Sequence, residues 1–125
     1  QAPGLVHTGS SAYYRADLDQ ITMPEKKLFD SAEQYFGVLY HEISHSTGHS
    51  SRLNRIGVSE PQQFASAIYG TEELIAEMGA GYLNNLTGIL DQSLLENSAN
   101  DKHLLIEAAS KAQKAVDYIL MEPPF

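Results

Sequence analysis

Residues 31–48 read SAEQYFGVLYHEISHSTG, and this stretch predicts the helix that organises the fold. Apolar side chains recur in it every three or four residues, the spacing of a single helix face, at Ala32, Tyr35, Phe36, Leu39, Tyr40 and Ile43. Ser31 and Gln34 match a capping box, in which two side chains satisfy backbone N–H groups at the start of a helix. Gly48 is a stop signal, so the helix is expected to end just before it.

The motif HExxH occupies residues 41–45 of this predicted helix. Side chains four residues apart lie on one helix face, so the imidazoles of His41 and His45 can reach one metal ion. Glu42 lies about 100° around the axis, too far to join that ligand set but well placed to take a proton from metal-bound water. The alternative, two polar histidines on a surface helix, is disfavoured because the motif seldom arises by chance in so short a chain. The pattern therefore predicts a zinc site with Glu42 as the catalytic general base.

A catalytic zinc needs a third protein ligand and an open position for water. In the extension HExxHxxGxxH the third ligand is a His, but that position is Ser51 here, and His49 comes two residues early. His49 is therefore expected to be a loop residue or to lie beside a ligand, rather than to bind the metal itself.

Better candidates for the third ligand lie in the acidic stretch EELIAE at residues 72–77. Glu73 and Glu77 are four residues apart on a predicted helix, so one can bind the metal while the other accepts a hydrogen bond from a ligand imidazole. Glu73 is favoured over Glu77 and Glu72, because only Glu73 leaves an acid one turn onward for that second role. Glu72 would then point about 100° away and contribute little. The alternative, a solvated acidic stripe, is disfavoured by the need for a third ligand.

Two further helices are predicted, over about residues 64–86 and about residues 101–121. The expected buried side chains of the first are Ile68, Ile75, Met78, Tyr82 and Leu86. Those of the second are Leu104, Leu105, Ala108, Ala112, Ala115, Val116 and Ile119. The side chains of this helix expected to face water are Lys102, Lys111 and Lys114.

Residues 12–16 and 20–23 are short β-prone segments separated by the polar turn Asp17-Leu18-Asp19. They predict a small hairpin or two edge strands, ended by Pro24. The first dozen residues contain several Gly, Ser and Pro, and they are expected to form a loosely held lead-in.

The composition fits one domain of 125 residues, with 42% of them hydrophobic. Its apolar runs are far shorter than the roughly 20 residues of a membrane span, no signal peptide opens the sequence, and no membrane partner is expected. The lack of cysteine excludes disulfides, thiolate zinc sites and a Cys nucleophile, and it fits the reducing cytoplasm, where the protein is expected. A net charge of −8 repels phosphate backbones, so direct nucleic-acid binding by these residues is disfavoured.

Three further residues after the motif each have two interpretations. Arg52 and Arg55 can bind a substrate carboxylate or backbone, but salt bridges with the chain's many acids are favoured. Tyr69 can donate a hydrogen bond to a developing oxyanion opposite the metal, but packing is the commoner role of a Tyr and is favoured here.

The pair Glu73 and Glu77 after HExxH resembles the gluzincin arrangement of thermolysin-like peptidases, in which an acid four residues beyond the ligand Glu orients the site. Over nearly its whole length the chain also resembles the C-terminal metallopeptidase domain of ArdC-type antirestriction proteins. The matching positions are residues 12–14, 19–24, 29, 31, 41–45, 47–49, 51–55, 69, 72–74, 76–77 and 108–115.

This resemblance implies an α+β, zincin-like fold, helical with a small β-sheet or hairpin packed beside the HExxH helix. It implies a zinc ion bound by His41, His45 and Glu73, and hydrolysis of a peptide bond in a protein or peptide substrate. The alternative is a non-catalytic antirestriction or interaction module with a structural metal. The presence of Glu42 argues against that alternative, because a structural site has no use for a base at this position.

The resemblance also bears on the length of the protein. Similar domains follow an N-terminal domain that binds single-stranded DNA, in proteins carried by plasmids, conjugative elements and phages. Residues 1–125 are therefore expected to be a C-terminal portion of a longer protein. Any binding of DNA is expected to belong to the missing N-terminal domain.

Overall fold

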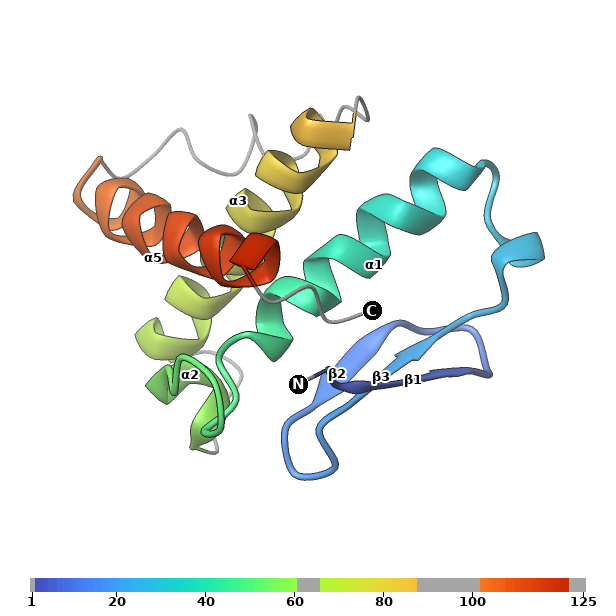
Figure 1. Ribbon diagram of the computed structural model, residues 1–125, viewed down its shortest axis with the longest axis horizontal. Helices are drawn as coiled ribbons and strands as arrows, with labels where there is room; N and C mark the ends of the chain where they lie inside the picture. The colour runs from blue at the N-terminus through green and yellow to red at the C-terminus, as the bar shows by residue number, and fades with distance from the viewer. Residues whose placement is uncertain (1, 61–65, 88–101, 122–125) are drawn as a thin grey trace.

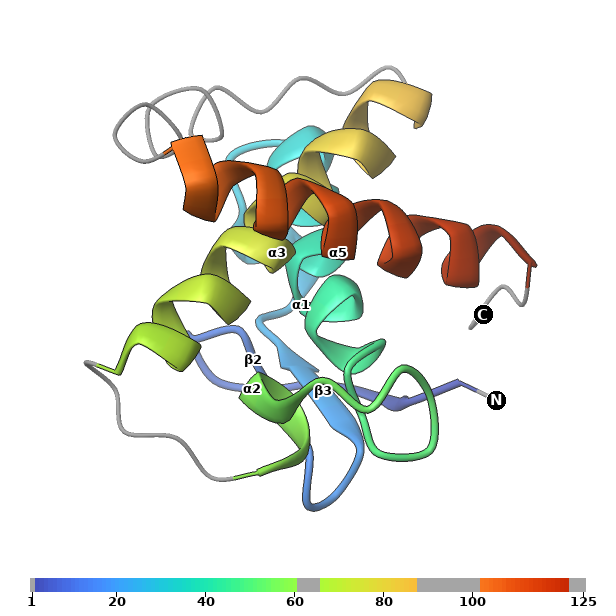
Figure 2. The same cartoon turned by 90° about the vertical axis from the view of Figure 1, so that its left-hand side faces the viewer.

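The computed structural model describes residues 2–60, 66–87 and 102–121. Its elements in chain order are β1 (Gly4–His7), β2 (Tyr13–Arg15), β3 (Gln20–Met23), the 3-10 turn η1 (Lys26–Leu28), α1 (Ala32–Ser46), α2 (Ile56–Ser59), α3 (Ala67–Thr87) and α5 (Lys102–Met121). Figure 1 shows α1 between the sheet and α3, with α5 lying across α3. The view turned by 90° places α1 between α5 and the sheet (Figure 2). This arrangement confirms the expected α+β class.

The sheet has the strand order β1-β3-β2, with β1 parallel and β2 antiparallel to the central strand β3. The β2–β3 hairpin is the one expected from the sequence, and Tyr14 pairs with Ile21 in its register. Asp19 closes the turn with a positive φ of 48°, which Asp tolerates better than most residues. The expectation of a loosely held lead-in is wrong for β1, whose four residues form a strand because their backbone pairs with β3.

Helix α1 begins and ends where the sequence predicts. Ser31 Oγ accepts a hydrogen bond from the backbone N–H of Gln34 (3.1 Å), and the Gln34 side chain accepts one from the N–H of Asp30 (2.9 Å). The second bond lies one residue earlier than in a standard capping box. The helix ends at Ser46, two residues before Gly48. One face packs on the sheet and forms a core of Ile21, Met23, Tyr35, Leu39 and Ile43.

Helices α3 and α5 pack together, and Ile75, Met78 and Ala112 form one buried cluster between them, as the sequence predicts. Ala115 and Val116 of α5 are also buried, as predicted. The expectation for Ile68 is wrong, because its side chain is 40% exposed. It lies in the first turn of α3, which faces an open groove that Ile56 of α2 also lines. The expected start of this helix, near residue 64, lies outside the described residues. So do five of the side chains named in the sequence analysis: Leu86, Lys102, Leu104, Leu105 and Ala108. No described helix is both long enough and apolar enough to cross a bilayer.

Small residues face each other where α1 meets α3. A Cβ atom added to Gly79 of α3 would lie 3.0 Å from Ser44 Cβ and closer still to Ser44 Oγ, so a larger side chain does not fit without movement. Ala76 and Ala80, on the same part of α3, are buried. This close approach allows the acids of α3 to reach the histidines of α1.

We expect Gly79→Ala to lower the free energy of unfolding by about 1–3 kcal/mol, because the added methyl group forces α1 and α3 apart. Gly70 is the matched control, since it lies in the same helix and an added Cβ would meet no atom within 4 Å. Gly70→Ala should raise the free energy of unfolding by about 0.5–1 kcal/mol through helix propensity. Urea unfolding of both variants measures the difference, and equal effects would contradict the close approach.

Candidate metal centre

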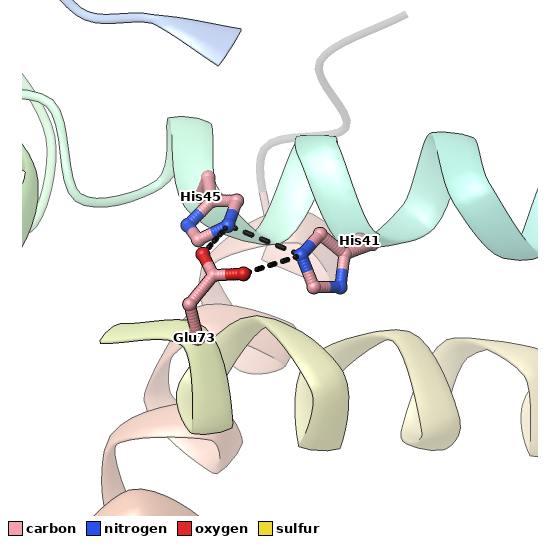
Figure 3. A group of neighbouring side chains, drawn as sticks. All are labelled: His41, His45 and Glu73. Atoms are coloured by element: carbon pink, nitrogen blue, oxygen red, sulfur yellow. Dashed lines mark hydrogen bonds and ion pairs between the residues drawn. The ribbon is translucent and has the colours of Figure 1, made fainter. Parts of the chain in front are cut away.

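The imidazoles of His41 and His45 on α1 face the carboxylate of Glu73 on α3 (Figure 3). The two Nε2 atoms are 3.2 Å apart. Glu73 Oε2 lies 2.8 Å from His45 Nε2, and Glu73 Oε1 lies 3.6 Å from His41 Nε2. One donor atom from each side chain lies within 4.8 Å of the other two, so the three residues could hold a metal ion.

The outer nitrogens of both rings contact carboxylates. His41 Nδ1 lies 3.2 Å from Glu77 Oε1, and His45 Nδ1 lies 2.8 Å from Glu72 Oε2. Because a carboxylate only accepts, each Nδ1 carries the proton, and in a neutral ring Nε2 then presents a lone pair. The structure therefore directs two lone pairs and a carboxylate at one point, which requires positive charge there.

The pKa values of the two histidines and of Glu73 also indicate that positive charge is required at this point. Burial lowers the pKa of His41, but hydrogen bonds to Glu73 and Glu77 outweigh it and raise the value to about 10. For His45 burial is likewise outweighed, by hydrogen bonds to Glu72 and Glu73, and the pKa is raised. Hydrogen bonds from the two imidazoles lower the pKa of Glu73. Either protons or a metal ion can supply the charge, and the donor set fits a metal.

The separation of the two imidazole nitrogens fits a tetrahedral metal ion such as zinc. Two nitrogens bound at about 2.0–2.1 Å in a tetrahedral zinc site are roughly 3.3 Å apart. The two Nε2 atoms lie 3.2 Å apart, close to this separation. Among the described residues, two imidazoles and one carboxylate converge, which is the number of protein ligands that a catalytic zinc site has.

Glu42 lies beside this group in a cleft of about 380 Å³. The cleft is bounded by the segment leading into β2, by α2 and by the start of α3, and its lining includes Tyr13, Tyr14, Val58, Tyr69 and Glu73. Glu42 is buried, and burial raises its pKa against the lowering effect of the two imidazoles. The carboxylate that the sequence assigns as the base therefore opens onto the same space as the candidate ligands.

Tyr69 lines this cleft and is half-buried. Burial is the main cause that raises the pKa of Tyr69, and the negative charges of Glu73 and Glu42 raise it further. The phenol thus lies within electrostatic reach of the site. The position of Tyr69 suits a hydrogen-bond donor, whereas the sequence favours a packing role.

The expectation that the Glu72 side chain points away from the site is wrong. Glu72 is 4% exposed, and its carboxylate bonds to His45 Nδ1. Glu72 does lie about 100° around the helix from Glu73, but an imidazole has nitrogens on two edges, and an acid at that angle can reach the outer nitrogen. Burial raises the pKa of Glu72, while hydrogen bonds from His45 and Arg55 outweigh it, so the pKa is lowered and the group stays charged.

The expectation of salt bridges for the two arginines is confirmed. Arg55 donates to both oxygens of Glu72, from Nε (2.9 Å) and Nη2 (3.0 Å). Arg52 donates to both oxygens of Asp19 at 2.8 Å each and to the carbonyl of Ser46 at 3.0 Å. The second pair fixes the β2–β3 turn to the end of α1, and with it the strand side of the cleft. His49, as expected, is a loop residue, and it bonds to Ser51.

Asp19 is expected to make stability depend on pH. The hydrogen bonds from Arg52 lower its pKa below the unfolded value of about 3.9. Its contribution is therefore present above that value and is lost as pH falls through the folded pKa. Asp19→Asn keeps a residue that tolerates positive φ, and it should cost about 1–2 kcal/mol at neutral pH but much less near pH 2. Urea unfolding at both pH values tests this, and a pH-independent difference would contradict it.

An HExxH helix that faces an acid on a second helix, beside a small sheet, is the arrangement of a zincin-type metal site. The chain belongs to the zincin-like metallopeptidase family, whose family model matches residues 2–111. This membership confirms the resemblance that the sequence shows.

Solved structures and relatives agree with this family. The Mn(II)-bound structure of the antirestriction protein ArdC from plasmid R388 is 36% identical, with a TM-score of 0.79 over 95% of this chain and 47% of ArdC. The metal-free ArdC structure is 35% identical, with a TM-score of 0.73 over 94% of this chain and 45% of ArdC. The DNA primase TraC of Escherichia coli is 34% identical over 90% of this chain and 8% of its own length. The protein y4eC of Sinorhizobium fredii is 37% identical over 90% of this chain and 39% of its own length. The chain thus spans less than half of each of these relatives.

Proposed function

We propose that this domain is a zinc-dependent peptidase in which His41, His45 and Glu73 bind the metal and Glu42 is the general base. The observation that carries the proposal is the convergence of three acceptor groups on one point, with no donor among them once both Nδ1 atoms are protonated. Glu42 lines the same cleft without belonging to that ligand group. A cation at this point and a base beside it are the two parts that metal-assisted hydrolysis requires.

Two imidazoles favour zinc over manganese, which prefers oxygen ligands. A related protein, ArdC, has been crystallised with Mn(II), which supports a divalent ion as a ligand of proteins that share this fold. When bound, the metal supplies a Lewis acid that polarises the scissile carbonyl and activates the attacking water.

The chain's own residues would carry the proton transfers. Glu42 takes a proton from the attacking water and passes it to the leaving amine. Its burial removes competing solvent and strengthens its basicity. Tyr69 donates a hydrogen bond to the oxyanion that develops on the carbonyl oxygen, from the side of the cleft formed by α3.

A peptide would enter as an extended segment along β2. Among the described strands β2 pairs only with β3, and the residues around it line the cleft. A strand edge of this kind offers backbone N–H and C=O groups to a substrate backbone. The acidic chain, with a net charge of −8, is unsuited to binding nucleic acid directly, so we propose that a protein or peptide in the cytoplasm is the substrate.

The second candidate function is a non-catalytic module, in which the metal is structural and antirestriction comes from binding alone. The observation that favours it is the similarity of this chain to ArdC, which is described as an antirestriction protein. A structural zinc, however, has four protein ligands, whereas three converge beside an open cleft in the described part of the chain.

A peptide-library digest tests the proposed function. The zinc-loaded chain is expected to cleave a subset of peptides, to lose that activity after chelation and to regain it when zinc is returned. Reloading with Mn(II) in parallel identifies the metal that supports turnover. If the loaded chain cleaves no peptide or protein in the library, alone or joined to the remainder of its protein, the binding module is the better account.

A further inference from the structure

Glu72 is a carboxylate on the outer side of the metal centre, and both of its oxygens are engaged. Oε2 accepts hydrogen bonds from His45 Nδ1 (2.8 Å) and Arg55 Nη2 (3.0 Å), and Oε1 accepts one from Arg55 Nε (2.9 Å). Its side chain is 5% exposed, so the charge depends on these partners rather than on water. The carboxylate is therefore held in one orientation against the imidazole.

Arg55 is in turn fixed to the end of α1, the helix that carries both histidines. Nη1 donates to Thr47 Oγ1 (2.8 Å), and Nη2 donates to the carbonyl oxygen of Ser44 (2.9 Å). A carbonyl near the end of a helix carries partial negative charge, which favours a guanidinium there. Arg55 thus connects the chain on both sides of His45 with the carboxylate that bonds to the His45 ring.

The stem of Glu72 is confined by α2. A Cβ atom added to Gly57 would lie 2.8 Å from Glu72 Cβ and 3.3 Å from Glu72 Cγ. The backbone of α2 therefore lies directly against this side chain and leaves its stem little room to move on that side.

The two histidines are held differently. His41 Nδ1 lies 3.2 Å from Glu77, whose side chain is 23% exposed, whereas His45 Nδ1 lies 2.8 Å from the buried, charge-paired Glu72. Short hydrogen bonds between charged and buried groups are the stronger ones. His45 is therefore the more firmly oriented of the two candidate ligands.

We propose that Glu72 and Arg55 are positioning residues that hold His45 with Nδ1 protonated and Nε2 directed at the metal centre. Arg55 acts through Glu72, and Glu72 acts through the ring of His45. The inference rests on the proposed function, because it gives the pair a role only if His45 binds a metal. Without the pair the ring is free to rotate or to move its proton, and metal binding must fix both again.

Zinc affinity, measured on the 125-residue chain by competition with a chromophoric chelator, is the first readout. Glu72→Gln removes the charge and turns an amide N–H group toward another donor, and it should weaken zinc binding by about 10–100-fold. Arg55→Lys keeps the charge but cannot hold both carboxylate oxygens, and it should weaken zinc binding by about 10-fold. Glu33→Gln is the control: it replaces Glu by Gln at an exposed site in the first turn of α1, and it should leave the zinc affinity unchanged.

The Nδ1–H signals of the zinc-loaded, ¹⁵N-His-labelled chain give a second readout that a general loss of stability would not reproduce. In Glu72→Gln the His45 signal should shift upfield or exchange away, while the His41 signal stays. In Glu77→Gln the reverse is expected, because Glu77 contacts the other ring. Each histidine thus serves as the control for the other within one molecule.

Retention of wild-type zinc affinity and of the His45 signal in both Glu72→Gln and Arg55→Lys overturns the positioning role while leaving the proposed function intact. Failure of the wild-type chain to bind zinc removes the proposed function, and the positioning role with it. If circular dichroism shows that Glu72→Gln does not fold, Arg55→Lys decides the question by the same two readouts.

Discussion

Replacing His41 or His45 by Ala is expected to abolish stoichiometric zinc binding. Each substitution removes one of three converging donors, so the loss should exceed the roughly 10–100-fold expected for a group that only orients a ligand. Glu73→Ala should have a comparable effect, since Glu73 alone supplies the acidic donor of the group found among the described residues. Elemental analysis after gel filtration, followed by chelator competition, measures both stoichiometry and affinity.

His49→Ala is the matched control for these variants. His49 lies in the loop after α1 and bonds to Ser51, outside the converging group. It should therefore retain one zinc per chain with unchanged affinity. Full metal retention in the His41→Ala, His45→Ala double variant would refute the site. Loss of zinc in His49→Ala, together with its retention in Glu73→Ala, would move the third ligand to the loop.

Glu42→Gln is expected to keep the fold and the zinc but to lower turnover by about 100-fold or more, the usual contribution of a general base. Glutamine preserves the shape of the side chain within its buried position and removes only the basic oxygen. Glu42 is not among the converging donors, so the metal content should not change. The measurement is single-turnover cleavage of the best peptide from the library, at equal zinc occupancy.

Glu33→Gln makes the same chemical change in the first turn of the same helix, where the side chain is exposed, and should leave turnover unchanged. Two results would contradict the assignment of Glu42. One is wild-type turnover in Glu42→Gln, and the other is loss of zinc from that variant, which would make Glu42 a ligand.

Local patterns in the sequence predict most of the fold. The cap at Ser31, the apolar face from Tyr35 to Ile43 and the stop at Gly48 lie within α1 or directly beside its ends, so they can be recognised without knowing which elements pack against the helix. The strand β1 could not be predicted in the same way, because it is four residues long and exists through pairing with β3. The exposure of Ile68 also depends on a neighbour, the open groove beside α2.

The candidate site, too, could be predicted from the sequence only where local patterns determine it. The periodicity of a helix brings His41 and His45 together and leaves Glu73 and Glu77 on one face of α3, and the structure brings all four into contact. The role of Glu72 depends on how α3 crosses α1 and on Arg55, which lies in the segment between these helices. Residue spacing within one helix predicts neither contact. The adjacent acids at 72 and 73 and the nearby Arg55 were the available signal, since a buried carboxylate needs a charged partner.

Anomalous diffraction at the zinc edge from crystals of the zinc-loaded chain tests the central claim most directly. We predict one strong peak per chain, bonded to His41 Nε2, His45 Nε2 and one oxygen of Glu73, with Glu42 facing the remaining position. A peak bonded instead to Glu77, Glu72 or His49, or the absence of any peak between α1 and α3, would contradict the account.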